Sequence, residues 1–425
     1  MKVKVYPAVC SGAVRVPPSK SLAHRALLCA GLAEGPSRIT GVSSSEDMAA
    51  TCGALEALGA KVVRSGDCCT VSGCGGVLFD LPETAIDCRE SGSTLRFLIP
   101  LAALGRNPVH LTGHGRLMER SQSVYETLFA QQGLRFERQN SRITVQGPLH
   151  GGKIVLDGNV SSQFITGLLF SLPLLPEDSR IEILPPFQSR GYVDLTLDTL
   201  RQFGVQAAFD GEYFLVIPGG QCYQARDAVV EGDYSQAAFF AVLSALRGGI
   251  RLANLRRDSL QGDKAIFPIL AAFGSQTRWA EDTAEILPAH LTGQRIDVSN
   301  CPDLAPILSV LGLYSEGMTV LCNAARLRDK ESDRIEAMET ELRKLGAQVE
   351  STCDSLTIHG WGNRPAFRET EVSGRNDHRV VMSLAIAATL GSAPVVIDGA
   401  EAIAKSYPDF FDDLRRIGGR AEVLS

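Results

Sequence analysis

The stretch Lys344-Leu345-Gly346-Ala347-Gln348-Val349 marks the point where a helical pattern ends at a glycine and a strand-like pattern begins. The stretch Ala57-Leu58-Gly59-Ala60-Lys61-Val62-Val63 has the same design nearer the N-terminus. A glycine directly after a helix suits the left-handed C′ position. Equivalent glycines recur at intervals of 70 to 74 residues, namely Gly59, Gly133, Gly204, Gly274, Gly346 and Gly418. This spacing predicts six copies of one unit, each too long for a solenoid repeat of about 20–50 residues.

A second, more apolar helix is predicted about 40 residues before each of these glycines. Apolar residues lie on nearly all sides of these helices, which is typical of buried helices. Each is expected to begin with a serine or aspartate that caps the free amides of its first turn. The predicted starts are Ser21, Ser93, Ser162, Ser235, Asp303 and Asp377. Short alternating segments between the helices, such as 142–145 and 213–217, are predicted to be strands.

The length of the chain predicts how these units are grouped. At 425 residues the chain exceeds the roughly 250–300 residues at which a single core stops growing. We therefore expect a mixed α/β protein of two similar domains, each with three units and three buried helices. The periodicity alone does not say which strands cross from one half of the chain to the other.

The bulk composition narrows the possible classes of function. A formal net charge of -6 at pH 7 argues against nucleic-acid binding, which usually uses a basic stripe. Eleven cysteines without a C-x-x-C pair predict core thiols in a reducing compartment and no metal site. The N-terminus lacks the apolar region of a signal peptide, and the most apolar run, 164–175, contains Pro173. We expect a cytoplasmic monomer with no nucleic-acid or membrane partner.

Polar residues gather at the predicted helix starts, where unpaired amides and about half a positive charge attract anions. In the first half of the chain these are Lys20, Ser21, Arg25, Gly92, Arg120, Ser161, Ser162 and Gln163. Small residues around Gly92 would let backbone amides approach a ligand. Each motif alone fits an ordinary cap, a turn or a solvated surface equally well or better.

The second half of the chain carries sharper signals. Asp303 opens a buried apolar helix, where a carboxylate is either a cap or a base. The segment Lys330-Glu331-Ser332-Asp333-Arg334 begins an outer helix, and in isolation it would be a solvated, ion-paired face. Arg379 and Lys405 complete a set of cations at equivalent ends of the units. Together these cations suit ligands that are rich in phosphate and carboxylate groups.

In this order the motifs resemble those of the EPSP synthase family of enolpyruvyl transferases. The shared motifs are P-x-S-K-S at 17–21, a Gly-rich segment at 91–93, S-S-Q-F at 161–164, K-E-S-D-R at 330–334 and N-D-H-R at 376–379. The resemblance implies an inside-out α/β barrel in each domain, built from three βαβαββ units with buried parallel helices. It also implies domains at 19–230 and at 1–18 with 231–425, with the active site in the cleft between them. Pro18, Glu90 and Arg326 depart from the family pattern.

The resemblance further implies the reaction and the residues that perform it. The enolpyruvyl group of phosphoenolpyruvate would pass to the 5-hydroxyl of shikimate 3-phosphate, without a cofactor or metal. The shikimate 3-phosphate site would comprise Lys20, Ser21, Arg25, Ser161, Ser162, Gln163, Ser189, Tyr192, Asp303 and Lys330. The phosphoenolpyruvate site would comprise Lys20, Gly92, Arg120, Gln163, Arg334, Arg379 and Lys405. The catalytic residues would be Asp303 as the base, Glu331 as the acid, and Lys20.

The resemblance also implies that glyphosate, an anionic phosphonate, competes with phosphoenolpyruvate. Gly92 is expected to leave room for this inhibitor, so that Gly92→Ala would weaken glyphosate binding more than phosphoenolpyruvate binding.

Two rival interpretations remain at this point. The sister enzyme that acts on UDP-N-acetylglucosamine has a Lys-Asn start and a reactive cysteine before its phosphoenolpyruvate-binding arginine. Here Ser21 follows Lys20, and 112–120 contains no cysteine. A non-catalytic anion-binding relative would have no need to retain Asp303 and Glu331 together with the cations.

Overall fold

The computed structural model describes residues 1–75, 78, 81–139, 141–362, 367 and 369–424. The chain divides into two compact units, Pro18–Val230 on the one hand and Met1–Pro17 with Glu231–Ser425 on the other. The division falls one residue before the boundary expected after Pro18. A Cβ atom added at Gly41 would lie 3.3 Å from Cβ of Pro18, so Pro18 packs with the unit that follows it.

The described strands form six four-stranded sheets, three in each unit. All six share one plan, which the sheet of β10 (Gly152–Asp157), β11 (Ser179–Leu184), β12 (Ala208–Asp210) and β13 (Phe214–Ile217) illustrates. The first strand pairs in parallel with the second, the second pairs antiparallel with the fourth, and the third lies at the edge. In four of the sheets an inner helix makes the crossover between the two parallel strands, and an outer helix follows.

In the other two sheets, β14 (Ala228–Val229) pairs in parallel with β3 (Glu34–Thr40), and β2 (Gly12–Arg15) pairs in parallel with β15 (Ile250–Ala253). β2 and β14 each lie just before a point where the chain passes from one unit to the other, so no single helix joins these pairs. The predicted βαβαββ unit is confirmed.

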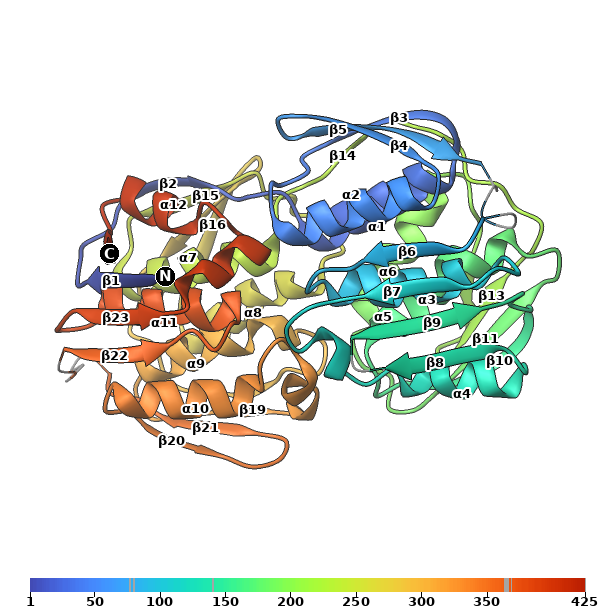
Figure 1. Ribbon diagram of the computed structural model, residues 1–425. Helices are drawn as coiled ribbons and strands as arrows, with labels where there is room; N and C mark the ends of the chain where they lie inside the picture. The colour runs from blue at the N-terminus through green and yellow to red at the C-terminus, as the bar shows by residue number, and fades with distance from the viewer. Residues whose placement is uncertain (76–77, 79–80, 140, 363–366, 368, 425) are drawn as a thin grey trace. The chain divides into compact units, whose positions relative to one another are not determined.

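The unit Pro18–Val230 contains three of these βαβαββ repeats (Figure 1). Its inner helices are α1 (Lys20–Leu32), α3 (Gly92–Ala102) and α5 (Ser162–Ser171), and its outer helices are α2 (Glu46–Ala57), α4 (Ser123–Gln131) and α6 (Arg190–Gln202). The remaining strands are β3 (Glu34–Thr40), β4 (Lys61–Ser65), β5 (Cys68–Cys74), β6 (Thr84–Asp87), β7 (Val109–Thr112), β8 (Arg135–Gln139), β9 (Arg142–Gln146) and β14 (Ala228–Val229). Short 3-10 helices are η2 (Leu117–Glu119) and η3 (Leu172–Leu174).

The other unit repeats the plan with the two ends of the chain in one sheet. Its inner helices are α7 (Tyr234–Arg247), α9 (Ala305–Leu313) and α11 (His378–Leu390), and its outer helices are α8 (Ile266–Phe273), α10 (Arg334–Lys344) and α12 (Phe410–Arg416). Its strands are β1 (Lys2–Tyr6), β2 (Gly12–Arg15), β15 (Ile250–Ala253), β16 (Gln276–Ala280), β17 (Thr283–Leu287), β18 (Arg295–Asp297), β19 (Met318–Cys322), β20 (Gln348–Ser351), β21 (Leu356–His359), β22 (Thr370–Ser373), β23 (Val395–Asp398) and β24 (Arg420–Leu424). Its 3-10 helices are η4 (Gly262–Ala265), η5 (Pro302–Leu304), η6 (Ala325–Asp329) and η7 (Ala400–Lys405). β1 pairs antiparallel with both β23 and β24.

The inner helices form the cores of the two units. Every residue of α9 and of α11 is buried. In α3 every residue except Ser93 is buried, and in α5 every residue except Gln163 is buried. α11 packs on α7, α9, β1 and β23, with the sheet on its outer side in Figure 1. The predicted burial of these helices is confirmed. No helix in the described part of the chain is long and apolar enough to cross a membrane.

The six repeated glycines have the conformation that their spacing predicts. Their φ angles run from +68° at Gly133 to +114° at Gly274. A side chain at such an angle would be strained, so glycine ends each outer helix at low cost.

The predicted capping residues are mostly wrong by one or two positions. Only Asp377 caps as expected, by accepting from the amide of Arg379. Residues upstream occupy the cap positions of the first four inner helices, namely Ser19, Ser91, Ser161 and Asp233. Asp303 lies in η5, which precedes α9. The cap is the residue with an extended backbone just before the first helical residue. Because the sequence does not show the backbone conformation, it does not distinguish two candidate residues that lie one or two positions apart.

The cysteines only partly match their expected place in the core. All eleven are free thiols, and five of them are buried. Cys222 and Cys353 are exposed, so the expectation of core thiols is wrong for these two.

Candidate functional site

Polar side chains connect the starts of several helices in the unit Pro18–Val230. Lys20 in α1 donates to Asp47 in α2 over 2.8 Å. The hydroxyls of Thr51 in α2 and Thr94 in α3 lie 2.9 Å apart. Gln163 in α5 accepts from Arg96 in α3 over 3.0 Å. These contacts link α1, α2, α3 and α5 within their first two turns, so the positive ends of these helices can act together on an anion.

Lys20 is the most accessible cation at this meeting point that the sequence singled out. Its side chain is 16% exposed and that of Asp47 is 9% exposed. The ion pair fixes the ammonium at the start of α1 in a partly desolvated place, where an anionic ligand would feel its charge more strongly than in water.

Arg25 is buried one turn further along α1. Its Nε donates to Thr196 over 2.9 Å, Nη2 donates to the carbonyl of Tyr192 over 3.0 Å, and Nη1 donates to the carbonyl of Ser21 over 2.6 Å. Burial lowers the pKa of Arg25 to about 10. Arg25 thereby joins α1 to α6, and it contacts the backbone of both Ser21 and Tyr192.

His24, next to Arg25, is a buried titratable group that the sequence did not single out. Its Nδ1 lies 2.7 Å from the hydroxyl of Thr51. Burial first, and then the charges of Lys20 and Arg25, hold the pKa of His24 well below its usual value. A neutral imidazole therefore links α1 to α2.

Gly92 and Arg120 lie against each other. A Cβ atom added at Gly92 would overlap the guanidinium of Arg120, at 3.0 Å from Cζ and 3.2 Å from Nη2. Arg120 follows η2 and is 8% exposed. Glycine at the start of α3 thus makes room for an arginine. A methyl group at this position would overlap the guanidinium of Arg120 unless that side chain moves.

The third helix start brings together Ser161, Ser162 and Gln163. Ser161 caps α5 by accepting from the amide of Gln163 over 3.4 Å, and Ser162 is the buried first residue of the helix. Nε2 of the Gln163 side chain donates to the hydroxyl of Ser93 over 3.0 Å. Ser189 precedes α6 in a left-handed conformation, with φ of +57°. Short hydroxyl side chains at two helix starts suit a phosphate.

In the other unit, Asp303 is the centre of a group of three cations. Its Oδ1 accepts from Arg334 over 2.8 Å and from Lys330 over 3.2 Å, and its Oδ2 accepts from Arg379 over 3.2 Å. These donors come from α10, from the residues before it and from α11. Three cations thus converge on one carboxylate, an arrangement that can bind an anion, although Arg334 also pairs with a second carboxylate, Asp377.

Arg334 is held between two carboxylates. Its Nε donates to Asp377 over 2.8 Å, and its side chain is 3% exposed while that of Asp377 is 0% exposed. Burial acts to raise the pKa of Asp377, but the charge of Arg334 and a hydrogen bond from it keep that pKa below its usual value. Asp377 therefore stays ionised, and it both caps α11 and orients Arg334.

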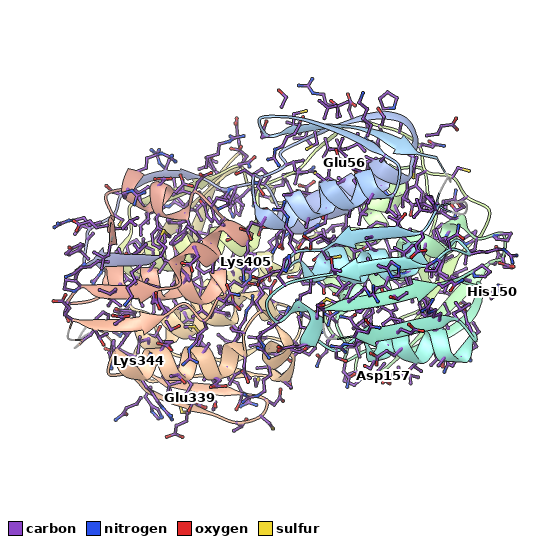
Figure 2. All side chains as sticks on the ribbon, viewed as in Figure 1. Glu56, His150, Asp157, Glu339, Lys344 and Lys405 are labelled. Atoms are coloured by element: carbon purple, nitrogen blue, oxygen red, sulfur yellow. The ribbon has the colours of Figure 1, made fainter. Side chains whose placement is uncertain are left out.

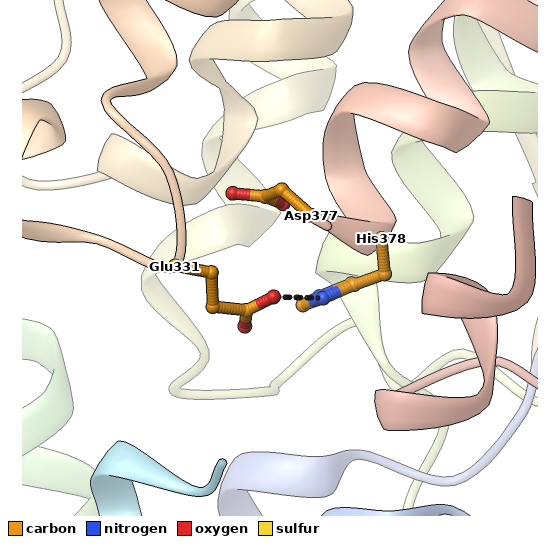
Figure 3. A group of neighbouring side chains, drawn as sticks. All are labelled: Glu331, Asp377 and His378. Carbon is orange, nitrogen blue, oxygen red and sulfur yellow. Dashed lines mark hydrogen bonds and ion pairs between the residues drawn. The ribbon is translucent and has the colours of Figure 1, made fainter. Parts of the chain in front are cut away.

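Glu331 and His378 form a second pair beside this group (Figure 3). Nδ1 of the buried His378 lies 2.9 Å from Oε2 of Glu331. Glu331, Asp377 and His378 offer potential metal-ligand atoms within 4.8 Å of one another. A cation there would have to compete with the guanidinium of Arg334 for Asp377. The contact with His378 holds Glu331, whose side chain is 16% exposed, so its carboxylate is accessible for proton exchange with a ligand.

Lys405 ends η7 and donates to the carbonyl of Asn376 over 2.6 Å. Asn376 directly precedes Asp377, so Lys405 is tied to the start of α11. The structure thus groups Asp303, Lys330, Arg334 and Arg379 by direct contact in this unit, and it ties Lys405 to the neighbouring backbone.

Sequence reasoning missed Asp47, Arg96 and the pairing role of Asp377. Asp47 is the second residue of α2, in the segment Ser45-Glu46-Asp47, which looks like any acidic first turn. Arg96 lies one turn inside an apolar helix, and this unusual place for a charge is a signal that could have identified it.

Comparisons with known proteins show which family the chain is similar to. The model of one family, EPSP synthase (3-phosphoshikimate 1-carboxyvinyltransferase), matches residues 6–414. A Clostridium kluyveri protein named 3-phosphoshikimate 1-carboxyvinyltransferase is 44% identical over 427 residues, or 100% of this chain and 99% of that protein. A protein of the same name from Clostridioides difficile is 40% identical over 99% of this chain and 98% of that protein.

Solved structures show the same fold. EPSP synthase from Acinetobacter baumannii has a TM-score of 0.81 at 26% identity, with 100% of both chains covered. The enolpyruvyl transferase NikO from Streptomyces tendae has a TM-score of 0.79 at 17% identity, covering 99% of this chain and 98% of that chain.

Proposed function

The chain belongs to the EPSP synthase family, and from this premise we propose that it transfers the enolpyruvyl group of phosphoenolpyruvate to the 5-hydroxyl of shikimate 3-phosphate. Phosphate is released, and the product serves the biosynthesis of aromatic amino acids. The observation that carries the proposal is the group of three cations around Asp303. It combines a base with the charges that a phosphate and a carboxylate require.

The proposed chemistry divides acid and base roles between two carboxylates. Glu331 protonates the methylene carbon of phosphoenolpyruvate, and Asp303 takes the proton of the attacking 5-hydroxyl. A carbon–oxygen bond forms to give a tetrahedral intermediate. The bond to phosphate then breaks while Glu331 takes a proton back from the new methyl group, which restores the double bond, and the proton held by Asp303 leaves with the phosphate. Different surroundings support different roles, because Asp303 faces three cations while Glu331 pairs with His378.

We divide the residues of the candidate site between the two substrates. We assign shikimate 3-phosphate to Ser21, Arg25, Ser161, Ser162, Gln163, Ser189, Tyr192 and Lys330, with Asp303 at its hydroxyl. We assign phosphoenolpyruvate to Lys20, Gly92, Arg120, Gln163, Arg334, Arg379 and Lys405. Lys20 contributes to both sites and stabilises the departing phosphate. Because these residues come from both units, the reaction would need both units, and we expect the bound anions to draw the units together. A smaller radius of gyration with both substrates in small-angle scattering would support this closure, and an unchanged radius would contradict it.

Phosphate release tests the proposed reaction. The purified chain is given phosphoenolpyruvate with shikimate 3-phosphate, with UDP-N-acetylglucosamine, or alone, and Asp303→Asn protein serves as the control for contaminating phosphatases. Release with shikimate 3-phosphate only is expected. Release with the nucleotide sugar would favour the sister reaction, whose cysteine the segment 112–120 lacks. Binding without release in any mixture would favour a non-catalytic relative.

We further propose that the protein works in the cytoplasm as a monomer, without a nucleic-acid partner. Light scattering coupled to gel filtration tests the monomer, since a mass of 45.6 kDa is expected and twice that mass would contradict it.

A further inference from the structure

Glu341 is a fully buried carboxylate that the proposed chemistry does not use. Its side chain is 0% exposed, and burying a charge is costly unless partners compensate it. Three donors do so: Nε of Arg375 over 2.8 Å, the backbone amide of Ser373 over 2.9 Å and Nζ of Lys344 over 2.7 Å. Two of these donors belong to one turn, at residues 373–376.

This turn has an unusual backbone. Arg375 and Asn376 both have φ of +52°, a conformation that costs non-glycine residues energy unless their surroundings enforce it. Gly374 donates to the carbonyl of Asp398 over 2.7 Å, and a side chain there would collide with Val381. The turn is therefore held on one side by Asp398 and on the other by Glu341.

The turn also places groups of the candidate site. The carbonyl of Asn376 accepts from Lys405 over 2.6 Å, and Lys405 is 4% exposed. The next residue, Asp377, accepts from Nε of Arg334 over 2.8 Å. Arg334 and Glu341 lie on the buried face of α10, two helical turns apart. α10 thus contacts both ends of the segment 373–377, through Glu341 at one end and Arg334 at the other.

We propose that Glu341 is a positioning residue: it holds the left-handed turn at 373–376 and thereby sets Lys405 and Arg334 for phosphoenolpyruvate. The inference rests on the proposed function for the identity of the ligand, but not for the turn itself. Removing the charge of Glu341 would release Arg375 from its strained conformation. The carbonyl of Asn376 would then turn away from Lys405.

The test compares Glu341→Gln with Glu339→Gln. Glu339 and Lys344 both belong to α10 and are labelled in Figure 2. Glu339 pairs with Arg343 over 2.7 Å and with Ser351, which are outside the turn. In Glu341→Gln we expect KM for phosphoenolpyruvate to rise about tenfold, as for loss of one hydrogen bond to a charged group. KM for shikimate 3-phosphate should stay within about twofold, and Glu339→Gln should match the wild type in both.

Hydrogen exchange without substrates separates this inference from the proposed reaction. Amides of 373–379 should exchange faster in Glu341→Gln than in the wild type or in Glu339→Gln. If the wild type proves inactive, the proposed function fails, while this exchange result still decides whether Glu341 holds the turn. Unchanged exchange at 373–379 would overturn the inference. A rise in both KM values together with a lower melting temperature would show a merely structural role and would overturn it as well.

Arg375→Ala provides a second variant in case Glu341→Gln does not fold, since the Arg375 side chain is 35% exposed and its loss leaves a smaller cavity. It should also raise KM for phosphoenolpyruvate. The double variant should show less than the sum of the two effects, because both changes break the same contact. Additive effects would contradict a shared role.

Discussion

Replacing Asp303 with asparagine is expected to separate catalysis from binding. The amide keeps the shape of the side chain but cannot take a proton, so kcat should fall by about 10²–10⁴. Asparagine also no longer neutralises Lys330, Arg334 and Arg379, which lie 2.8 to 3.2 Å from the carboxylate. KM for phosphoenolpyruvate should therefore remain the same or fall, because Asp303 no longer competes with the anion for these cations.

The same contacts give the expected loss of stability. Breaking a buried ion pair costs about 3–5 kcal/mol, but Asp303 is 22% exposed and its three contacts share one carboxylate. We therefore expect about 2–4 kcal/mol, or roughly 5–15 °C in melting temperature for a unit of this size.

The assay is phosphate release at varied phosphoenolpyruvate, together with thermal melting with and without this ligand. Asp297→Asn is the matched control, since Asp297 lies on the same chain segment but bonds only to Ser299 and Asn323 in the described contacts. A kcat within tenfold of the wild type would refute Asp303 as the base. Parallel loss of ligand binding would reduce it to a structural residue.

Three further outcomes are expected. The unfolded chain protonates His24 below pH 6.5, while the folded chain keeps it neutral. Stability should therefore fall by up to about 1.4 kcal/mol per pH unit below pH 6.5, and urea unfolding of His24→Gln should lack this contribution. Gly92→Ala should displace Arg120 and raise both KM for phosphoenolpyruvate and the inhibition constant of glyphosate. A change in the inhibition constant alone would restore the simpler idea that the methyl group meets the inhibitor. Tyr125→Phe should lower the free energy of unfolding by about 1–2 kcal/mol, because the hydroxyl donates to carbonyls in α3 and α5. Denaturant unfolding with an unchanged midpoint would contradict that role.

Features that arise within one repeat could be predicted from the sequence. Gly59 and Gly346 adopt the left-handed conformation because a helix followed at once by a strand needs a sharp change of direction. The burial of α11 follows from its apolar residues on all sides. The cap of each inner helix was harder to place, since Ser19 and Ser21 are equivalent by local signals.

Features that depend on neighbouring helices could not be derived in this way. Lys20 and Asp47 are 27 residues apart, and Arg334 and Asp377 are 43 residues apart. No pattern within one helix says which distant carboxylate compensates which cation. The residues proposed to act on substrate therefore came from family resemblance, while the partners that orient them came from the structure.

Product analysis tests the central proposal most directly. The purified chain is incubated with equal amounts of phosphoenolpyruvate and shikimate 3-phosphate, and the products are followed by mass spectrometry and by phosphorus NMR. We expect shikimate 3-phosphate to gain one enolpyruvyl group while it keeps its own phosphate, with one inorganic phosphate released for each product formed. Phosphate release without a change in the mass of shikimate 3-phosphate would contradict enolpyruvyl transfer and would indicate simple hydrolysis.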